Sequence, residues 1–297
     1  MDWFLFAFAV PFCWAGVVLM DKFFLTRHFK NPLSYQAFAT LTSALALPVL
    51  WFFSRPTLSA LVPFALLGGF FVSLSYVFYN KALMIDKNCD NVVSLVYLKP
   101  LFVVVLAGFF LGEVLKPGAY LGIFFLVFSA LLVTYEEKNS WRRFGKVLSL
   151  VLAYVIIFAL WEVASKWLLG SFDPFSLLFW STLGGLPGGV LLLAGRNVRT
   201  HFFEGIEGLS KREWLMRFFS LSLFLSGFAL FYFALSDGPV SLVSAVPSVQ
   251  PFVVFVYTFS LSLFLPEFLF EKHTRLNVLL NSLGAVLLFI GTYLIVA

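Results

Sequence analysis

Charged residues, cysteines and catalytic motifs are all scarce in this sequence. Only 12% of its 297 residues are Asp, Glu, Lys or Arg, and its two cysteines, Cys13 and Cys89, lack the Cys/His spacing of a metal site. Neither a disulfide framework nor a structural metal is indicated. The GxxxxGK(S/T), GxGxxG, GxSxG and HExxH motifs are also missing from the sequence. We therefore expect no enzyme activity, no metal and no cofactor.

Apolar residues, in contrast, are abundant. They make up 61% of the chain, which contains 40 Phe and 8 Trp, and the mean hydropathy is +0.96. A soluble domain could not hide that much apolar surface, so the sequence predicts an all-α integral membrane protein surrounded by lipid. The net charge of +5 does not indicate a nucleic-acid partner, because the charges lie in short loops between apolar runs.

Ten apolar runs are long enough to cross a membrane. All should be helices, because a spanning segment must satisfy its backbone internally and these runs are too uniformly apolar for barrel strands. The first run has no basic residues before it, unlike a signal peptide, so we expect it to be retained. The predicted spans are residues 3–20, 34–54, 60–83, 91–111, 117–135, 145–169, 174–195, 214–235, 240–264 and 276–296.

The basic residues outside the spans are distributed unequally. The loops after odd-numbered spans hold 16 Lys and Arg residues, whereas the opposite side holds three. Basic loops face the cytoplasm, so this bias predicts a multi-pass protein of the cytoplasmic membrane with both termini outside the cytoplasm.

The two halves of the chain repeat each other, which predicts one five-helix repeat over 1–139 and another over 140–297. Five spans per half is an odd number, so the second repeat should enter the membrane inverted, as in many secondary carriers. Chance similarity among apolar helices is the alternative. Four motifs correspond in order: Asn31-Pro32 with Asp173-Pro174, Ala82-Leu83 with Ala234-Leu235, Lys99-Pro100 with Gln250-Pro251, and Gly122 and Ser129 with Gly284 and Gly291.

The fourth span carries Lys99 and Pro100 near its middle. A lysine at that depth costs roughly 2.5–3.5 kcal/mol on insertion scales, so it should face protein or a wet cavity. Pro100 lacks an N–H, so the carbonyl of Val96 should lose its helical partner and the helix should bend. A charge beside a broken hydrogen-bond ladder is typical of a substrate site. Alternatively, Lys99 pairs with a buried carboxylate and merely joins two helices.

The ninth span resembles the fourth. Pro247 and Pro251 flank Gln250, and Ser248 belongs to a row of serines at helical spacing, which either forms a polar face or packs closely against another helix. In the fourth span, ideal helix geometry places Tyr97 about 200° from Lys99, so these two side chains should not share a face unless the kink at Pro100 relaxes this geometry.

Glu162 is a second costly charge, in the sixth span. Lys166 follows one turn later in the order that favours a helical pair, so a neutralising pair near the membrane surface is the simpler interpretation. The alternative makes Glu162 a proton-coupling group, or a partner of the substrate or of Lys99.

Other motifs suggest structural roles. Gly184-Gly185 and Gly188-Gly189 in the seventh span predict tight packing inside the bundle, with dimerisation as the less favoured alternative. Lys81 should extend to the cytoplasmic interface, with a role in a cavity as the alternative. Three glutamates near helix ends are more typical of capping or gating than of coupling: Glu113, Glu267 and Glu271.

This arrangement resembles the drug/metabolite transporter superfamily, and within it the EamA-like carriers. The resemblance rests on Ala-Leu pairs, Pro-centred helices, acidic residues and Gly-spaced last helices in both halves, and it covers essentially the whole chain. It implies a central cavity lined by spans 1, 3, 4, 6, 8 and 9. Similar carriers usually keep both termini in the cytoplasm and an uncharged residue before the proline of span 4, so this chain departs from them in its loop charges and at Lys99.

We therefore expect a secondary active transporter of small, possibly anionic, organic metabolites that works by alternating access. It would be a monomer by default, although a dimer is conceivable, and a proton or a counter-substrate would drive it. The alternatives are an exporter of lipophilic cations and a flippase for an anionic lipid carrier. The expected substrate-binding residues are Lys99, Gln250, Trp14, Trp161, Glu162, Tyr79, Lys81, Tyr97, Tyr232 and Ser248, and the expected helix breaks are Pro100, Pro247 and Pro251.

Overall fold

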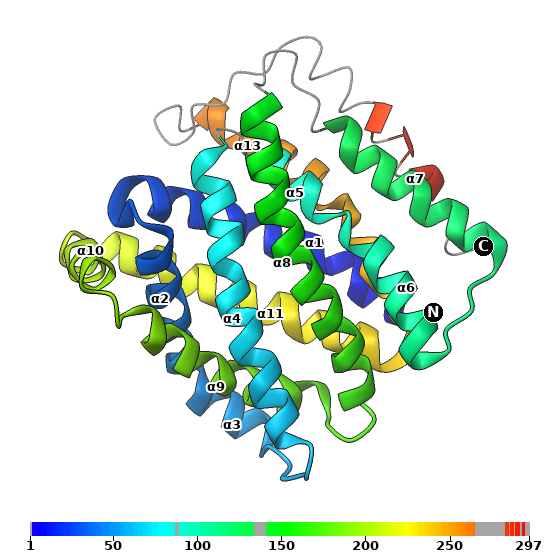
Figure 1. The fold of residues 1–297 in the computed structure, drawn as a ribbon, viewed down its shortest axis with the longest axis horizontal. Helices are drawn as coiled ribbons and strands as arrows, with labels where there is room; N and C mark the ends of the chain where they lie inside the picture. Colours follow the sequence, from blue (N-terminus) through cyan, green and yellow to red (C-terminus); the bar gives the residue numbers. More distant parts are fainter. Residues whose placement is uncertain are drawn as a thin grey trace.

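The computed structural model describes residues 2–86, 89–133 and 141–264, together with 283–284, 286–287, 289–291 and 293–294. Within this part of the chain the regular structure is entirely helical, as the composition predicts (Figure 1). The α-helices are α1 Asp2–Phe24, α2 Pro32–Ser43, α3 Leu47–Ser54, α4 Val62–Ile85, α5 Cys89–Val96, α6 Lys99–Leu111, α7 Pro117–Val133, α8 Trp141–Leu168, α9 Pro174–Leu192, α10 Arg196–Glu207, α11 Lys211–Asp237, α12 Val240–Ala245 and α13 Gln250–Phe264.

Among the described residues, eight helical segments are long and apolar enough to cross a membrane, and they correspond to spans 1–4 and 6–9 of the sequence prediction. The fifth predicted span is α7, whose 17 residues lie at the short end of the spanning range. The tenth, 276–296, falls mostly outside the described residues. Helix α10 was not predicted, because its polar sequence was assigned to a loop. It buries Phe202 and Gly205, and a Cβ on Gly205 would meet the ring of Phe29.

Helices of the two halves are packed in reciprocal pairs. Helix α1 of the first half contacts α11 of the second, and α4 of the first contacts α8 of the second. In Figure 1 the α4–α8 pair runs across the α1–α11 pair. These two pairs form the centre of the bundle.

The repeated Asn/Asp-Pro motif begins the same helix in each half. The Asn31 side chain accepts a hydrogen bond from the Leu33 N–H, and Pro32 stands in the first turn of α2. The Asp173 side chain accepts bonds from two N–H groups at the start of α9, where Pro174 takes the corresponding position. Capping oxygens and a first-turn proline are the ordinary signals of a helix start.

The repeated Ala-Leu motif marks a helix end that a lysine caps. Lys22 on α1 donates to the carbonyls of Leu83 and Asp86 at the end of α4. Lys166 on α8 donates to Leu235 O at 2.7 Å and to Gly238 O at 3.0 Å, at the end of α11. A cation at these free carbonyls is stabilised by the helix dipole. The predicted Glu162–Lys166 pair is therefore wrong, because Lys166 binds backbone carbonyls instead.

The fourth and ninth spans are each interrupted and cross each other. Helix α5 contacts α13 while α6 contacts α12, so the two spans run antiparallel. In the fourth span a turn at residues 97–98 separates α5 from α6, and Pro100 lies in the first turn of α6. In the ninth, Pro247 opens a short 3-10 helix and Pro251 lies in the first turn of α13. The prolines thus lie in the first turns of new helices instead of bending continuous ones.

Glycines bring α4 and α9 into backbone contact. A Cβ on Gly69 would lie 2.0 Å from the carbonyl oxygen of Ser181, and one on Gly184 would lie 2.2 Å from that of Leu66. Any side chain larger than hydrogen would separate these helices. The tight packing predicted from the glycine motif is confirmed within the bundle.

The small residues of the fourth repeated motif also meet. The Ser129 hydroxyl on α7 donates to Gly284 O at 2.8 Å, and a Cβ on Gly291 would lie 2.8 Å from Gly122 O. The pairing of 129 with 284 and of 122 with 291 makes these two segments antiparallel. The repeated positions thus contact each other.

Candidate functional site

Two cavities lie side by side in the centre of the bundle. The first, of about 100 Å³, is lined by α1, α2, α4, α8, α9 and α11, and we call it the polar cavity. The second, of about 60 Å³, contains Lys99 in its wall, and we call it the lysine cavity. Four residues line both cavities, so together they form one candidate site with two lobes. The shared residues are Val17, Asp21, Tyr76 and Phe224.

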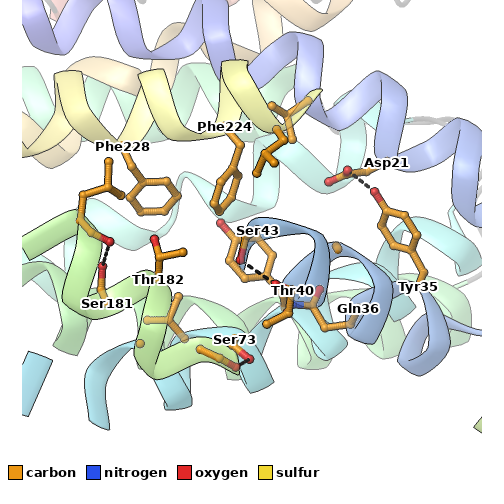
Figure 2. A pocket seen from close by; sticks show the side chains of 18 of the residues that line it. Asp21, Tyr35, Gln36, Thr40, Ser43, Ser73, Ser181, Thr182, Phe224 and Phe228 are labelled. Carbon is orange, nitrogen blue, oxygen red and sulfur yellow. Dashed lines mark hydrogen bonds between the residues drawn. The ribbon is translucent and has the colours of Figure 1, made fainter. Parts of the chain in front are cut away.

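The wall of the polar cavity contains a connected set of amides and hydroxyls. Gln36 Nε2 donates to Thr40 Oγ1 at 2.9 Å, and Asn80 Nδ2 donates to Gln36 Oε1 at 2.8 Å. Ser73 Oγ donates to Gly185 O at 3.1 Å across the α4–α9 contact. In Figure 2 the ring of Phe224 points from α11 towards this wall. A polar floor facing aromatic rings suits a ligand with both polar and apolar parts.

Asp21 and Arg217 bring opposite charges to the polar cavity. The Asp21 carboxylate accepts a hydrogen bond from the Tyr35 hydroxyl (Figure 2). Arg217 is only 4% exposed and donates from Nε to Thr42 Oγ1 at 2.9 Å and from Nη2 to Ala39 O at 2.8 Å. Sequence reasoning missed both residues because they lie near span ends. Arg217 was counted as a loop charge, as was the buried Lys22, and both assignments are wrong.

Lys99 forms a buried ion pair with Glu162 at the lysine cavity. Its Nζ donates to Glu162 Oε1, and Ser244 Oγ donates to the other carboxylate oxygen at 2.7 Å. The side chains of Lys99 and Glu162 are 3% and 0% exposed. Lys99 Nζ also lies 4.9 Å from the ring centre of Phe158. Of the alternatives for Glu162, the structure therefore shows the pairing with Lys99.

Tyr97 and Gln250 connect the two interrupted spans. The Tyr97 hydroxyl donates to Gln250 Oε1, and both residues line the lysine cavity together with Lys99. The expectation that Tyr97 and Lys99 lie on different faces is wrong, because the turn at 97–98 replaces the ideal helix on which that angle was calculated. The lysine cavity also contains Trp14, whose buried Nε1 has no hydrogen-bond partner in the described part of the protein.

The remaining predicted residues lie at different distances from the two lobes. Tyr79 lines the lysine cavity, and Trp161 lines the polar cavity while its Nε1 donates to Tyr232 OH at 3.1 Å. Tyr232 and Ser248 are buried but line neither lobe. Lys81 is partly exposed and also lines neither.

Glu113 has the capping role that its position suggests. Its carboxylate accepts from the N–H groups of Val240 at 2.8 Å and Ser241 at 3.2 Å, at the start of α12. Glu267 and Glu271 lie outside the described residues. Across the described ranges, no three His, Cys, Asp or Glu residues are grouped as metal ligands.

The apolar helices and the central two-lobed site define a multi-pass membrane protein. Residues 1–135 match the EamA-like transporter family. The first part of the chain is therefore similar to this family of transporters, which lies within the drug/metabolite transporter superfamily. This similarity indicates membrane transport of a small molecule.

A solved structure shares the fold over nearly the whole chain. It is described only as "Crystal structure of protein", and it is 17% identical with a TM-score of 0.65, covering 98% of this chain and 96% of that one. A comparison with curated proteins found no match.

Proposed function

We propose that the protein is a secondary active transporter of small organic metabolites that binds its substrate in the two-lobed site and works by alternating access. The observation that carries this proposal is the crossing of two interrupted spans beside a cavity that both halves line. Discontinuous helices place unpaired backbone groups and polar side chains at the middle of a membrane protein, where transporters hold substrates.

We also propose ten transmembrane helices arranged as inverted repeats over 1–139 and 140–297. The reciprocal contacts support this arrangement. The contact of α1 with α11 corresponds to that of α8 with α4, and the contact of α5 with α13 corresponds to that of α12 with α6. The lysine caps on Leu83 O and Leu235 O add support, because the same motif is capped from corresponding helices. The proposed membrane is the cytoplasmic one, with both termini outside. The loop-charge bias supports this orientation even after Lys22 and Arg217 are removed from the count.

The proposed substrate contacts in the lysine cavity are Trp14, Tyr79, Tyr97, Lys99 and Gln250. Glu162 already compensates the charge of Lys99, so an anionic substrate would have to displace this carboxylate. Protonation of Glu162, or competition by an anion for Lys99, would break the pair. We therefore assign proton or counter-substrate coupling to this pair.

The test is solute counterflow in proteoliposomes. The panel contains carboxylates, phosphate esters, amino acids, neutral metabolites and lipophilic cations. A carrier concentrates labelled solute transiently against an internal pool of unlabelled solute. The double variant Lys99→Met/Glu162→Gln should lose most of this accumulation, whereas Lys146→Met, at an exposed lysine on α8, should retain it. Counterflow by the double variant at the unmodified rate would remove the pair from the mechanism, and no counterflow of any solute would overturn the proposal.

One observation favours a second candidate, the export of lipophilic cations. Asp21 places a carboxylate in the wall of both lobes, next to Tyr76 and Phe224, and cations bind well between a carboxylate and aromatic faces. Counterflow restricted to lipophilic cations would select this candidate.

A further inference from the structure

The opposite charges of Asp21 and Arg217 face the same cavity without forming an ion pair. His28 pairs with Glu213 and Lys99 with Glu162, whereas Asp21 and Arg217 form no ion pair with each other in the described part of the chain. Asp21 binds a neutral phenol, and Arg217 binds a threonine hydroxyl and a backbone carbonyl. Each charge thus has polar neighbours but no opposite charge in contact.

Such an arrangement is costly unless a ligand completes it. Removing a charge from water costs several kcal/mol, and a neutral hydrogen-bond partner recovers only part of this. The chain elsewhere follows the usual solution, since Lys99 and Glu162 compensate each other directly. A ligand with a single charge would compensate Asp21 or Arg217 and leave the other exposed to the cavity. A ligand with both charges compensates both.

We propose that the polar cavity binds a small zwitterion, with its ammonium group at Asp21 and its carboxylate at Arg217. This proposal deepens the proposed function and rests on it, because it names the substrate class of the same two-lobed site. The bonds to Thr42 and Ala39 use two of the five guanidinium N–H donors of Arg217, and the remaining donors can bind a carboxylate. The faces of Tyr76 and Phe224 line the cavity together with Asp21 and favour an ammonium group.

Neutral groups between the two charges complete the site. Gln36, Thr40 and Thr182 line the same cavity, and they offer amide and hydroxyl partners to polar atoms of the ligand. Phe228, which Figure 2 shows pointing from α11 towards α9, provides an apolar wall. Specificity for a zwitterion thus comes from the two ends of the cavity, and size selection comes from its sides.

The test compares three charge forms of the same compounds on the purified, detergent-solubilised protein. The probes are β-alanine and the proteinogenic amino acids with uncharged side chains. Each is tested with its methyl ester, which keeps only the ammonium charge, and with its N-acetyl derivative, which keeps only the carboxylate charge. The rise in melting temperature, measured as a function of ligand concentration, reports binding without requiring transport. At least one zwitterion should bind about tenfold or more tightly than both of its derivatives, since each derivative loses one charge-assisted contact.

Two variants should each remove the preference for the zwitterion over one of its derivatives. Asp21→Asn should bind the N-acetyl derivative and the zwitterion with equal affinity. Arg217→Gln should bind the methyl ester and the zwitterion with equal affinity. Asp21→Glu and Arg217→Lys keep the charges and should retain the preference, which also covers the case in which a neutral variant does not fold. The matched controls are Asp237→Asn and Arg199→Gln, which make the same chemical changes at exposed positions.

The outcomes separate this proposal from the proposed function. No stabilisation by any zwitterion, or equal binding of a zwitterion and its derivatives, overturns the inference. Unchanged preferences in Asp21→Asn and Arg217→Gln overturn it as well. Binding of a zwitterion without counterflow supports the inference and contradicts the transport proposal, whereas counterflow of a solute that zwitterions do not inhibit supports transport and overturns the inference.

Discussion

Two sets of opposite charges lie in the core of this bundle, and they are arranged in contrasting ways. Lys99 on α6 and Glu162 on α8 are in direct contact and almost completely buried. Asp21 on α1 and Arg217 on α11 face one cavity and bind only neutral groups. In both sets the first half of the chain supplies one charge and the second half supplies the other.

The difference indicates what each set can do without a ligand. The Lys99–Glu162 pair is compensated in the structure itself, so it joins the two halves without a ligand. Asp21 and Arg217 are held by the neutral partners that orient them, which leaves their charges available to the cavity. Their compensation must come from a ligand or from a change in the position of α1 relative to α11.

The largest expected effect comes from breaking the joined pair. Glu162→Gln leaves the Lys99 ammonium buried without a counter-charge, and it should lower the free energy of unfolding by about 3–5 kcal/mol. Thermal and denaturant unfolding in detergent would measure this change. The double variant Lys99→Met/Glu162→Gln should recover most of the loss, because it contains no buried charge at this position. A Glu162→Gln protein as stable as the double variant would show that the pair is not a closed unit.

A second variant tests an uncharged contact between the same halves. Gly184→Ala places a Cβ 2.2 Å from the backbone oxygen of Leu66, so α4 and α9 must separate. Overpacking of this kind costs about 1–3 kcal/mol. Gly145→Ala is the matched control, since nothing lies within 4 Å of the added Cβ. Equal melting temperatures for the two variants would contradict the close contact between α4 and α9.

The lysine caps should have a smaller effect. Lys166→Met removes the cation from the carbonyls that end α11, and the expected loss is about 0.3–1 kcal/mol, rising to ~2 kcal/mol if the site is well shielded. Lys146→Met removes an exposed lysine from the same helix and should change little. Hydrogen exchange at the end of α11 would locate the effect, and exchange unchanged there would contradict the capping role.

Asp21→Asn should have the smallest effect on stability, which would sharpen the contrast with Glu162→Gln. The amide oxygen still accepts a hydrogen bond from the Tyr35 hydroxyl, and no ion pair is lost, so the free energy of unfolding should fall by less than about 1 kcal/mol. Parallel unfolding curves of the two variants would measure this difference. A loss at Asp21 as large as that at Glu162 would place a structural ion pair where the structure shows none.

Hydropathy and repeated motifs predicted much of the fold for direct physical reasons. Span length follows from membrane thickness, and the helix interruptions follow from Pro100, Pro247 and Pro251, which cannot donate backbone hydrogen bonds. The repeated Ala-Leu motif also had a real structural counterpart, although the lysines that cap it were not recognised. Helix α10 was missed because its polar, amphipathic sequence resembles a loop when only apolar runs are counted.

The candidate site was harder to predict because its contacts join distant residues. Lys99 and Glu162 are 63 positions apart, so nothing local distinguished this pair from the nearer Lys166. Asp21 and Arg217 stand at the ends of apolar runs, where most charges belong to loops. The structure shows that both lie inside helices, because α1 and α11 continue for at least three residues beyond the charge towards the loop.

The backbone contact between α4 and α9 restricts how the two halves can move. These helices belong to different halves, and their glycines leave no space in which one helix could slide along the other without collision. In the alternating access proposed above, a rotation about this contact would keep α4 and α9 together, and the contact would then be the axis of the motion. Displacements grow with distance from a rotation axis, so residues far from α4 and α9 should move most and the glycines least.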